Sequence, residues 1–230
     1  AKGSGMIHPN MGTMLCFLTT DAAISAPMVQ KALQAAADKS FNMVSIDGDT
    51  STNDTMTLMA NGMAGNTLID SENEDYGLFY EALEAMCIQL ARMIAADGEG
   101  ASRLLVCKLT GAKDEETARV IAKAVICSSL VKAAMFGADA NWGRVLCAIG
   151  YSGAEVDVTK VDVSFASKAG TLDVCKDGAG IPFDEDVAKK VLLEDEVDII
   201  VVLHDGEGYA EAYGCDLTYE YVRINGDYRT

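Results

Sequence analysis

Apolar and polar residues alternate in short blocks along this chain, in patterns that predict an alternation of strands and helices. Residues 14–20 form an apolar run of strand length, and Ser25 followed by Pro27 is typical of the start of a helix, here extending to about Lys39. A second apolar run, residues 41–46, is expected to be a strand that ends in the polar loop DGDTSTND.

Two helices are expected after this loop. A short one contains Met56 and Leu58, and a long one runs from about Glu74 to Ala96 and stops at the stretch DGEG. The core-facing side of the long helix is predicted from apolar residues that recur at steps of four and three, namely Phe79, Leu83, Met86, Leu90 and Met93.

The second half of the chain continues the alternation of strands and helices. Residues 101–110 predict a strand, and Asp114 is the expected N-cap of a helix to Phe136, supported by Glu115 and Arg119 four residues apart. The remaining expected elements are helices at 141–150 and 184–193 and extended stretches at 160–167, 170–178, 197–204 and 209–217. The order of elements predicts a mixed α/β protein, and the glycines near residue 100 suggest a domain boundary there.

Composition narrows the classes of partner. Half of the 230 residues are hydrophobic and 23% are charged, which is typical of a globular protein. The formal net charge of −17 argues against a nucleic-acid or anionic-membrane binder, because phosphates repel such a surface. The sequence contains no stretch of about 18 apolar residues, as a membrane span requires, and no recognisable signal peptide. Small metabolites, cations and other proteins remain as partners.

The cysteines and histidines indicate neither disulfides nor a metal site. The seven cysteines are an odd number without a C-x-x-C pair, and there are only two histidines. We therefore expect a reducing, cytoplasmic compartment and no metal cofactor. His8 and His204 have no evident carboxylate or thiol partner in the sequence. Trp142 is interpreted as a core aromatic rather than a stacking platform. The stretch KGSG lacks the pattern of a phosphate loop.

Two stretches suggest competing enzymatic chemistries. A strand that ends in D-x-D-x-T is typical of aspartate-nucleophile phosphohydrolases, in which Asp47 would attack phosphorus and Asp49 would be the acid/base, with Mg²⁺ between them. The alternative is a polar loop in which Thr50 and Asp54 cap the next helix.

In NMGTML, Thr13 follows the small Gly12 and precedes a strand, as in enzymes that cleave themselves to expose a threonine. The freed α-amine, with a pKa of about 7.7 to 8, then serves as base for the hydroxyl of the same residue.

Five blocks give the chain a resemblance to a known family. KGSGMIHPNMGTML, DGDTSTNDT, DGEGA, GADANWGR and YVRINGDYRT occur in this order across the whole chain. They resemble the bifunctional ornithine acetyltransferase/N-acetylglutamate synthase family of arginine biosynthesis. The resemblance implies that residues 1–12 are the end of an α segment and residues 13–230 a β segment. Self-cleavage would occur between Gly12 and Thr13, a junction where many family members have Ala in place of this glycine.

The resemblance also implies a fold, a reaction and a set of site residues. The expected fold is a layered α/β catalytic domain of the ornithine acetyltransferase or DmpA-like type, residues 1–100 plus 217–230, with a second, smaller α/β domain at 101–216. The implied reaction is transfer of acetyl from N2-acetyl-L-ornithine to L-glutamate through an acetyl-Thr13 intermediate. No cofactor is implied, although some family members also use acetyl-CoA as a substrate. The implied substrate-binding residues are Lys2, Thr13, Glu99, Asn225 and Thr230.

The side-chain types suit these roles. Lys2 can neutralise an α-carboxylate, Glu99 can pair with an ammonium, and Asn225 offers both a donor and an acceptor. The tail would return to the site as a lid. The family's oxyanion donors are a Thr-Gly pair in the α segment, upstream of this sequence, and the family expectation is an α2β2 heterotetramer.

Three alternatives stay open at this point. An aminopeptidase or amidase would use the same Thr13 but pass the acyl group to water. The Asp47/Asp49 phosphohydrolase would need Mg²⁺ and would not depend on Thr13. An acidic binding subunit without activity would be insensitive to any substitution of Thr13.

Overall fold

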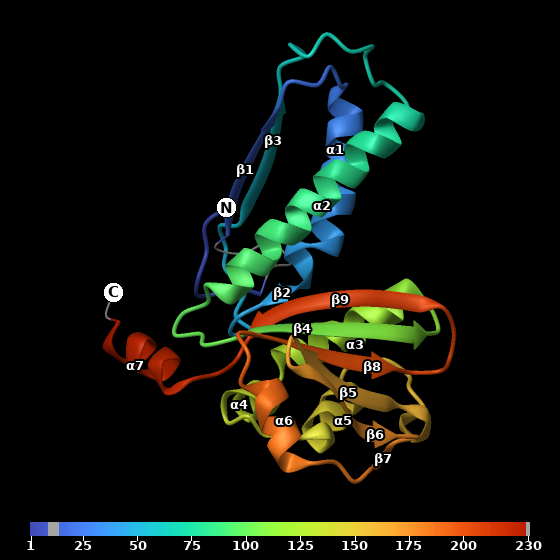
Figure 1. Cartoon of the computed structure of the whole chain (residues 1–230). Helices are drawn as coiled ribbons and strands as arrows, with labels where there is room; N and C mark the ends of the chain where they lie inside the picture. Colours follow the sequence, from blue (N-terminus) through green and yellow to red (C-terminus); the bar gives the residue numbers. More distant parts are fainter. Residues whose placement is uncertain (9–13, 229–230) are drawn as a thin grey trace. The chain divides into compact units, whose positions relative to one another are not determined.

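The computed structural model describes residues 1–8 and 14–228 of the chain (Figure 1). The chain forms two compact units, Ala1–Ile94 and Ala95–Thr230. The division lies close to the expected boundary near residue 100. The tail from residue 217 groups with the second unit, whereas the sequence analysis places it in the catalytic domain with residues 1–100. The second unit is consequently the longer of the two, where a smaller domain is expected.

The first unit contains a pair of parallel strands and two long helices. Strand β1 (Leu15–Thr20) pairs with β3 (Thr55–Ala60), with Leu15 opposite Thr55 and Thr20 opposite Ala60. Side chains of β1 alternate, so that Cys16 and Leu18 are buried while Phe17 is exposed. The other elements of this unit are α1 (Ala26–Lys39), η1 (Phe41–Met43), β2 (Val44–Ser45) and α2 (Glu74–Ala96), whose last two residues belong to the second unit.

The predicted helix around Met56 and Leu58 is wrong, because these residues belong to strand β3. The stretch TMTLMA alternates threonines with larger apolar residues at a period of two, which suits a strand paired along its whole length with β1. The preceding polar loop therefore caps no helix. Thr50 Oγ1 instead donates to the carbonyl of His8 at 2.9 Å.

Helix α2 forms where predicted but buries a different face. Its buried residues include Leu83, Cys87, Ala91 and Ile94, which follow one another at steps of four and three. Met86 and Met93, expected in the core, are 52% and 57% exposed. The small residues at 87 and 91 allow close packing of this face, and a pattern that counts only large apolar residues misses them.

The second unit is built on a mixed sheet. Its strands lie in the order β9-β4-β8-β5-β6-β7 (Figure 1). Only the β4–β8 pair among the pairings within this unit is parallel in the part of the chain that the structure describes. The strands are β4 (Leu104–Ala112), β5 (Asp162–Ser167), β6 (Gly170–Lys176), β7 (Ala179–Gly180), β8 (Glu196–Val202) and β9 (Gly208–Cys215).

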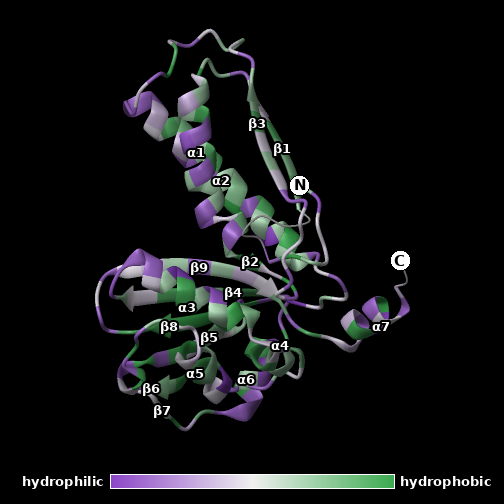
Figure 2. Ribbon diagram, turned by 180° about the vertical axis from the view of Figure 1, so that it is seen from behind, coloured by the Kyte–Doolittle hydropathy of each residue, from purple (hydrophilic) through white to green (hydrophobic). Residues whose placement is uncertain are grey.

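The core of this unit lies along the inner strands, where hydrophobic colouring follows β4 and β8 (Figure 2). Leu105, Cys107 and Leu109 of β4 are fully buried, since helix α3 packs on β4 and β9. The helices of the unit are α3 (Glu115–Cys127), α4 (Ser129–Phe136), α5 (Trp142–Gly150), η2 (Val158–Lys160), α6 (Glu185–Leu192) and α7 (Tyr219–Asp227).

The long helix predicted from Asp114 to Phe136 is interrupted. Asp114 does cap α3, accepting the Thr117 N–H at 2.8 Å, but Ser128 has an extended backbone and caps a second helix, α4, by accepting the Val131 N–H. Arg119 forms an ion pair with Glu116 at 4.0 Å, while its pairing with Glu115 stays a prediction.

Candidate active site

Two of the expected substrate-binding residues meet in the second unit. The Nδ2 atom of Asn225, on helix α7, donates a 2.9 Å hydrogen bond to Oε2 of Glu99, in the loop between α2 and β4. The two residues are 126 positions apart in the sequence. The same Asn225 nitrogen donates to the Tyr221 carbonyl at 3.1 Å, which orients the amide along the helix. A carboxylate and an amide therefore lie side by side at the surface, where they can contact an ammonium and an amide group of one ligand.

Helix α7 is held to the loop that carries Glu99. Thr218 is the N-cap of α7 and accepts the Tyr221 N–H, while its hydroxyl donates to the Gly100 carbonyl at 2.6 Å. Gly100 has φ +68°, and a Cβ atom there would lie 2.5 Å from the Tyr221 nitrogen. Only glycine lets the loop and the first turn of α7 approach so closely.

The other expected site residues belong to the first unit or lie outside the described residues. Gly12, Thr13 and Thr230 are outside the described residues. Lys2 is exposed, and its backbone pairs with β1 through hydrogen bonds with Leu15 of 2.8 and 2.9 Å. The main chain of residue 2 is thus paired with the first residue of β1.

The residue directly after Thr13 is fixed by Asp54. The Met14 N–H donates to Asp54 Oδ1, and the Met14 carbonyl accepts the Thr55 N–H at 2.8 Å. Burial raises the pKa of the Asp54 carboxyl, although the Met14 hydrogen bond opposes this shift. The second oxygen, Oδ2, is buried and has no hydrogen-bond partner within the described part of the chain. No local pattern indicates this role of Asp54 beyond its place in a polar loop.

The carboxylate of Asp47 is used to hold the backbone. It accepts the Met6 N–H at 2.7 Å, the Ile7 N–H at 3.1 Å and the Asp49 N–H at 3.3 Å. Both of its oxygens are therefore engaged with amides, which leaves the carboxylate poorly placed to attack phosphorus. Within residues 1–8 and 14–228 no group of three or more His, Cys, Asp or Glu side chains could hold a metal ion. This geometry favours the polar-loop interpretation of DGDTSTND over the phosphohydrolase.

The two histidines have partners that the sequence analysis missed. His8 Nδ1 lies 3.1 Å from Ser45 Oγ, and His204 Nε2 lies 2.8 Å from Asp162 Oδ2. The first pair joins an imidazole to a hydroxyl and the second joins one to a carboxylate, so neither pair by itself is a nucleophile–histidine–carboxylate triad. Trp142 is half-buried rather than part of the fully buried core, and its ring lies 2.4 Å from the place where a Cβ on Gly180 would be.

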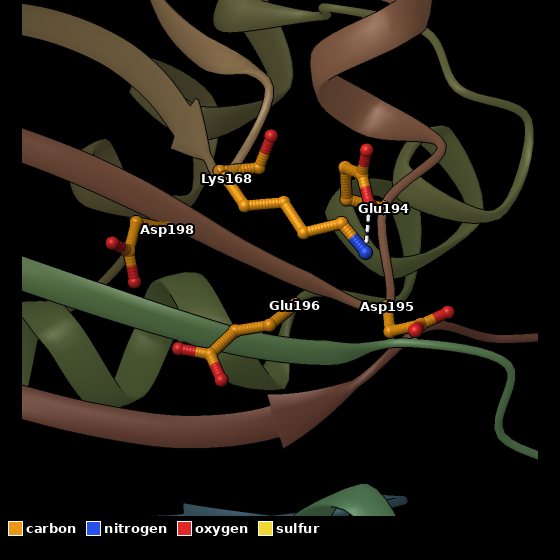
Figure 3. A pocket seen from close by; sticks show the side chains of 6 residues that line it. Lys168, Glu194, Asp195, Glu196 and Asp198 are labelled. Carbon is orange, nitrogen blue, oxygen red and sulfur yellow. Dashed lines mark ion pairs between the residues drawn. The ribbon is translucent and has the colours of Figure 1, made fainter.

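A separate surface cavity of about 410 Å³ in the second unit holds none of the expected residues (Figure 3). Four carboxylates line it with one cation, Lys168, whose Nζ pairs with Glu194 at 2.7 Å (Figure 3). The lining residues are Ser167, Lys168, Glu194, Asp195, Glu196 and Asp198.

Comparison with known proteins gives a family. The model of the ArgJ family matches residues 1–230. The chain belongs to the ArgJ family. The resemblance that the five sequence blocks suggest is confirmed, and the described part of this ArgJ-family chain contains no helix long and apolar enough to cross a membrane.

Relatives agree with the family match. The chain is 55% identical over 230 residues to the arginine biosynthesis bifunctional protein ArgJ 1 of Clostridium acetobutylicum, and 53% identical to the ArgJ protein of Caldanaerobacter subterraneus. Each alignment covers 100% of this chain but only 56% and 57% of those proteins, so the chain spans little more than half of their length.

A solved structure supports the fold. The crystal structure of the arginine biosynthesis bifunctional protein ArgJ from Bacillus halodurans matches with a TM-score of 0.90 and 46% identity. The match covers 94% of this chain and 100% of that one. The mixed α/β class expected from the sequence is therefore confirmed.

Proposed function

We propose that the protein containing this chain is a glutamate N-acetyltransferase that moves acetyl from N2-acetyl-L-ornithine to L-glutamate in arginine biosynthesis. The observation that carries the proposal is the hydrogen bond between Glu99 and Asn225 in a chain of the ArgJ family. Glu99 belongs to the block DGEGA and Asn225 to the block YVRINGDYRT, and the two residues are 126 positions apart in the sequence. Their contact is what a shared substrate site requires.

The first step is self-cleavage between Gly12 and Thr13. The Thr13 hydroxyl attacks the Gly12 carbonyl, the peptide C–N bond breaks, and the nitrogen takes a proton to become the free α-amine of Thr13. Water then hydrolyses the resulting ester, which returns the hydroxyl and leaves a carboxylate on Gly12. Gly12 favours this reaction because it places no side chain in the path of the hydroxyl.

The cleaved chain then carries out acetyl transfer. The Thr13 α-amine takes the hydroxyl proton while the oxygen attacks the acetyl carbonyl of N2-acetylornithine. The C–N bond breaks, the ornithine nitrogen takes the proton, and acetyl remains on the Thr13 oxygen. The neutral amine of glutamate attacks the ester carbonyl, and the C–O bond to Thr13 breaks. The glutamate nitrogen loses a proton to the Thr13 oxygen by way of the α-amine, so that N-acetylglutamate leaves and the hydroxyl of Thr13 is restored.

The other residues of the proposed site recognise the two amino acids. Glu99 pairs with an ammonium, Asn225 with an amide group, and Lys2 with an α-carboxylate, while Thr230 completes the site from the tail. The oxyanion is stabilised by the Thr-Gly pair of the α segment. Acetyl-CoA is a second acetyl donor in this proposal, and the assembly is an α2β2 heterotetramer in the cytoplasm, with no cofactor.

Intact-protein mass spectrometry of the full-length protein and of its Thr13→Ala variant tests the central residue. We expect the wild type to divide into two chains, the second beginning at Thr13, and the variant to stay whole and to form no N-acetylglutamate. A wild type that stays whole and active would refute the proposal. Release of free acetate without transfer to glutamate would assign the same Thr13 to an amidase instead.

A further inference from the structure

The loop that carries Glu99 is bound to the chain around helix α7 by a series of contacts in opposing order. Asp216 binds residues 102 and 103, Thr218 binds Gly100, and Asn225 binds Glu99. The residue numbers rise along the C-terminal segment while those of their partners in the loop fall, so the two segments run antiparallel. The position of Glu99 relative to Asn225 thus depends on the two contacts that precede it.

Asp216 is the deepest of these contacts. It is 3% exposed, and its carboxylate accepts the Ser102 N–H at 2.8 Å, the Arg103 N–H at 3.1 Å and the Ser102 hydroxyl. The Arg103 guanidinium lies 3.5 Å from Asp216 Oδ2 and also donates to the Met135 carbonyl at 3.0 Å. A buried carboxylate with this many charge-assisted hydrogen bonds fixes the base of the loop.

Thr218 connects this base to the Glu99–Asn225 pair. Its side chain is 6% exposed, and its single hydroxyl both donates to the Gly100 carbonyl and caps α7. Gly100 is the neighbour of Glu99, and Asn225 lies on the helix that Thr218 caps. One hydroxyl therefore connects the backbone that carries the carboxylate with the helix that carries the amide.

We infer that Thr218 and Asp216 are positioning residues that fix the Glu99 carboxylate relative to Asn225 and thereby set the preference of the site for an acyl donor with an ammonium group. The inference rests on the proposed function, in which Glu99 binds that ammonium. A charge pair discriminates between ligands only if the carboxylate is held at the right distance, since the interaction falls off with distance and solvent competes for a mobile side chain.

The experiment measures kcat/KM of the full-length protein for two donors. N2-acetylornithine carries the ammonium, and N-acetylnorvaline has the same carbon chain without it. In Thr218→Val, which keeps the shape and removes the hydroxyl, we expect the ratio of the two kcat/KM values to fall about fivefold to tenfold, as the loss of one well-placed hydrogen bond implies. Thr218→Ser keeps the hydroxyl and should retain the wild-type ratio.

Two controls separate positioning from general damage. Thr159→Val removes another hydroxyl of the second unit, which donates to Asp157 at 2.6 Å, and should leave the ratio unchanged. In a Glu99→Gln background, Thr218→Val should lower the ratio no further, because the carboxylate through which Thr218 acts is gone. If Thr218→Val does not fold, Thr218→Ala removes the hydroxyl without placing a methyl group against the Gly100 carbonyl.

Two results would overturn the inference in distinguishable ways. An equal loss for both donors in Thr218→Val, with the ratio unchanged, would mean that Thr218 supports the fold and does not position Glu99. A wild type that does not prefer N2-acetylornithine over N-acetylnorvaline would show that Glu99 does not bind an ammonium, and the inference would fall together with that part of the proposed function.

Discussion

Lys123 on helix α3 shows how the partial burial of a charged group affects stability. Burial lowers the pKa of its ammonium to about 8, although the nearby Cys127 raises it slightly and Arg119 adds to the lowering. The unfolded chain therefore binds more protons than the native one between about pH 8 and the ordinary lysine value near 10.4. Because stability rises with pH wherever the unfolded state binds more protons, this group costs stability at neutral pH and the cost is relieved above pH 8.

Replacement of Lys123 by methionine removes this cost. We expect Lys123→Met to raise the free energy of unfolding at pH 7 by about 1–3 kcal/mol and to remove the gain in stability that the wild type shows between pH 8 and 10. Urea unfolding at pH 7, 8 and 10 measures both effects. Lys190→Met, on α6, is a control, and an equal pH dependence in wild type and Lys123→Met would contradict the argument.

The contact between Gly100 and helix α7 decides where a whole element lies. We expect Gly100→Ala to lower the free energy of unfolding by more than about 1 kcal/mol and to loosen α7, because an alanine would have φ +68° and a Cβ 2.5 Å from the Tyr221 nitrogen. Hydrogen exchange of the amides in Tyr219–Asp227 measures the loosening. Gly150→Ala is the matched control, since a Cβ there meets nothing within 4 Å and its φ is not positive. Equal protection of α7 in both variants would be evidence against a tight contact.

At the scale of the whole molecule, this chain spans 56% and 57% of the two relatives described above. The resemblance assigns the oxyanion donors to the remaining α segment. We expect residues 1–230 purified alone to transfer acetyl at least about 10² to 10³ times more slowly than the full-length protein, the usual cost of losing one such donor. Steady-state assays of both proteins at equal concentration measure the difference, and adding the separately produced α segment should restore activity. Full activity of residues 1–230 alone would contradict the prediction.

The sequence by itself determined those elements for which the capping residues and the hydrophobic periodicity predict the same secondary structure. The cap at Asp114, the helices near 141–150 and 184–193, and the buried run of β8 all form where their patterns predict them, because caps and periodicity act over a few residues. The five blocks also determined the family. Thr218 had an available signal, since a threonine just before a helix is a typical N-cap, but nothing local reveals its bond to Gly100.

Only the tertiary structure decided the features that depend on distant neighbours. Residues 55–60 form a strand because β1 pairs with them, and α2 turns its small residues inward because they allow close packing. Glu99 meets Asn225 across 126 positions through Asp216 and Thr218. Hydrogen bonds between segments so far apart produce no periodic pattern in the sequence. Each partner residue is compatible with its local structure whether or not the distant partner is present.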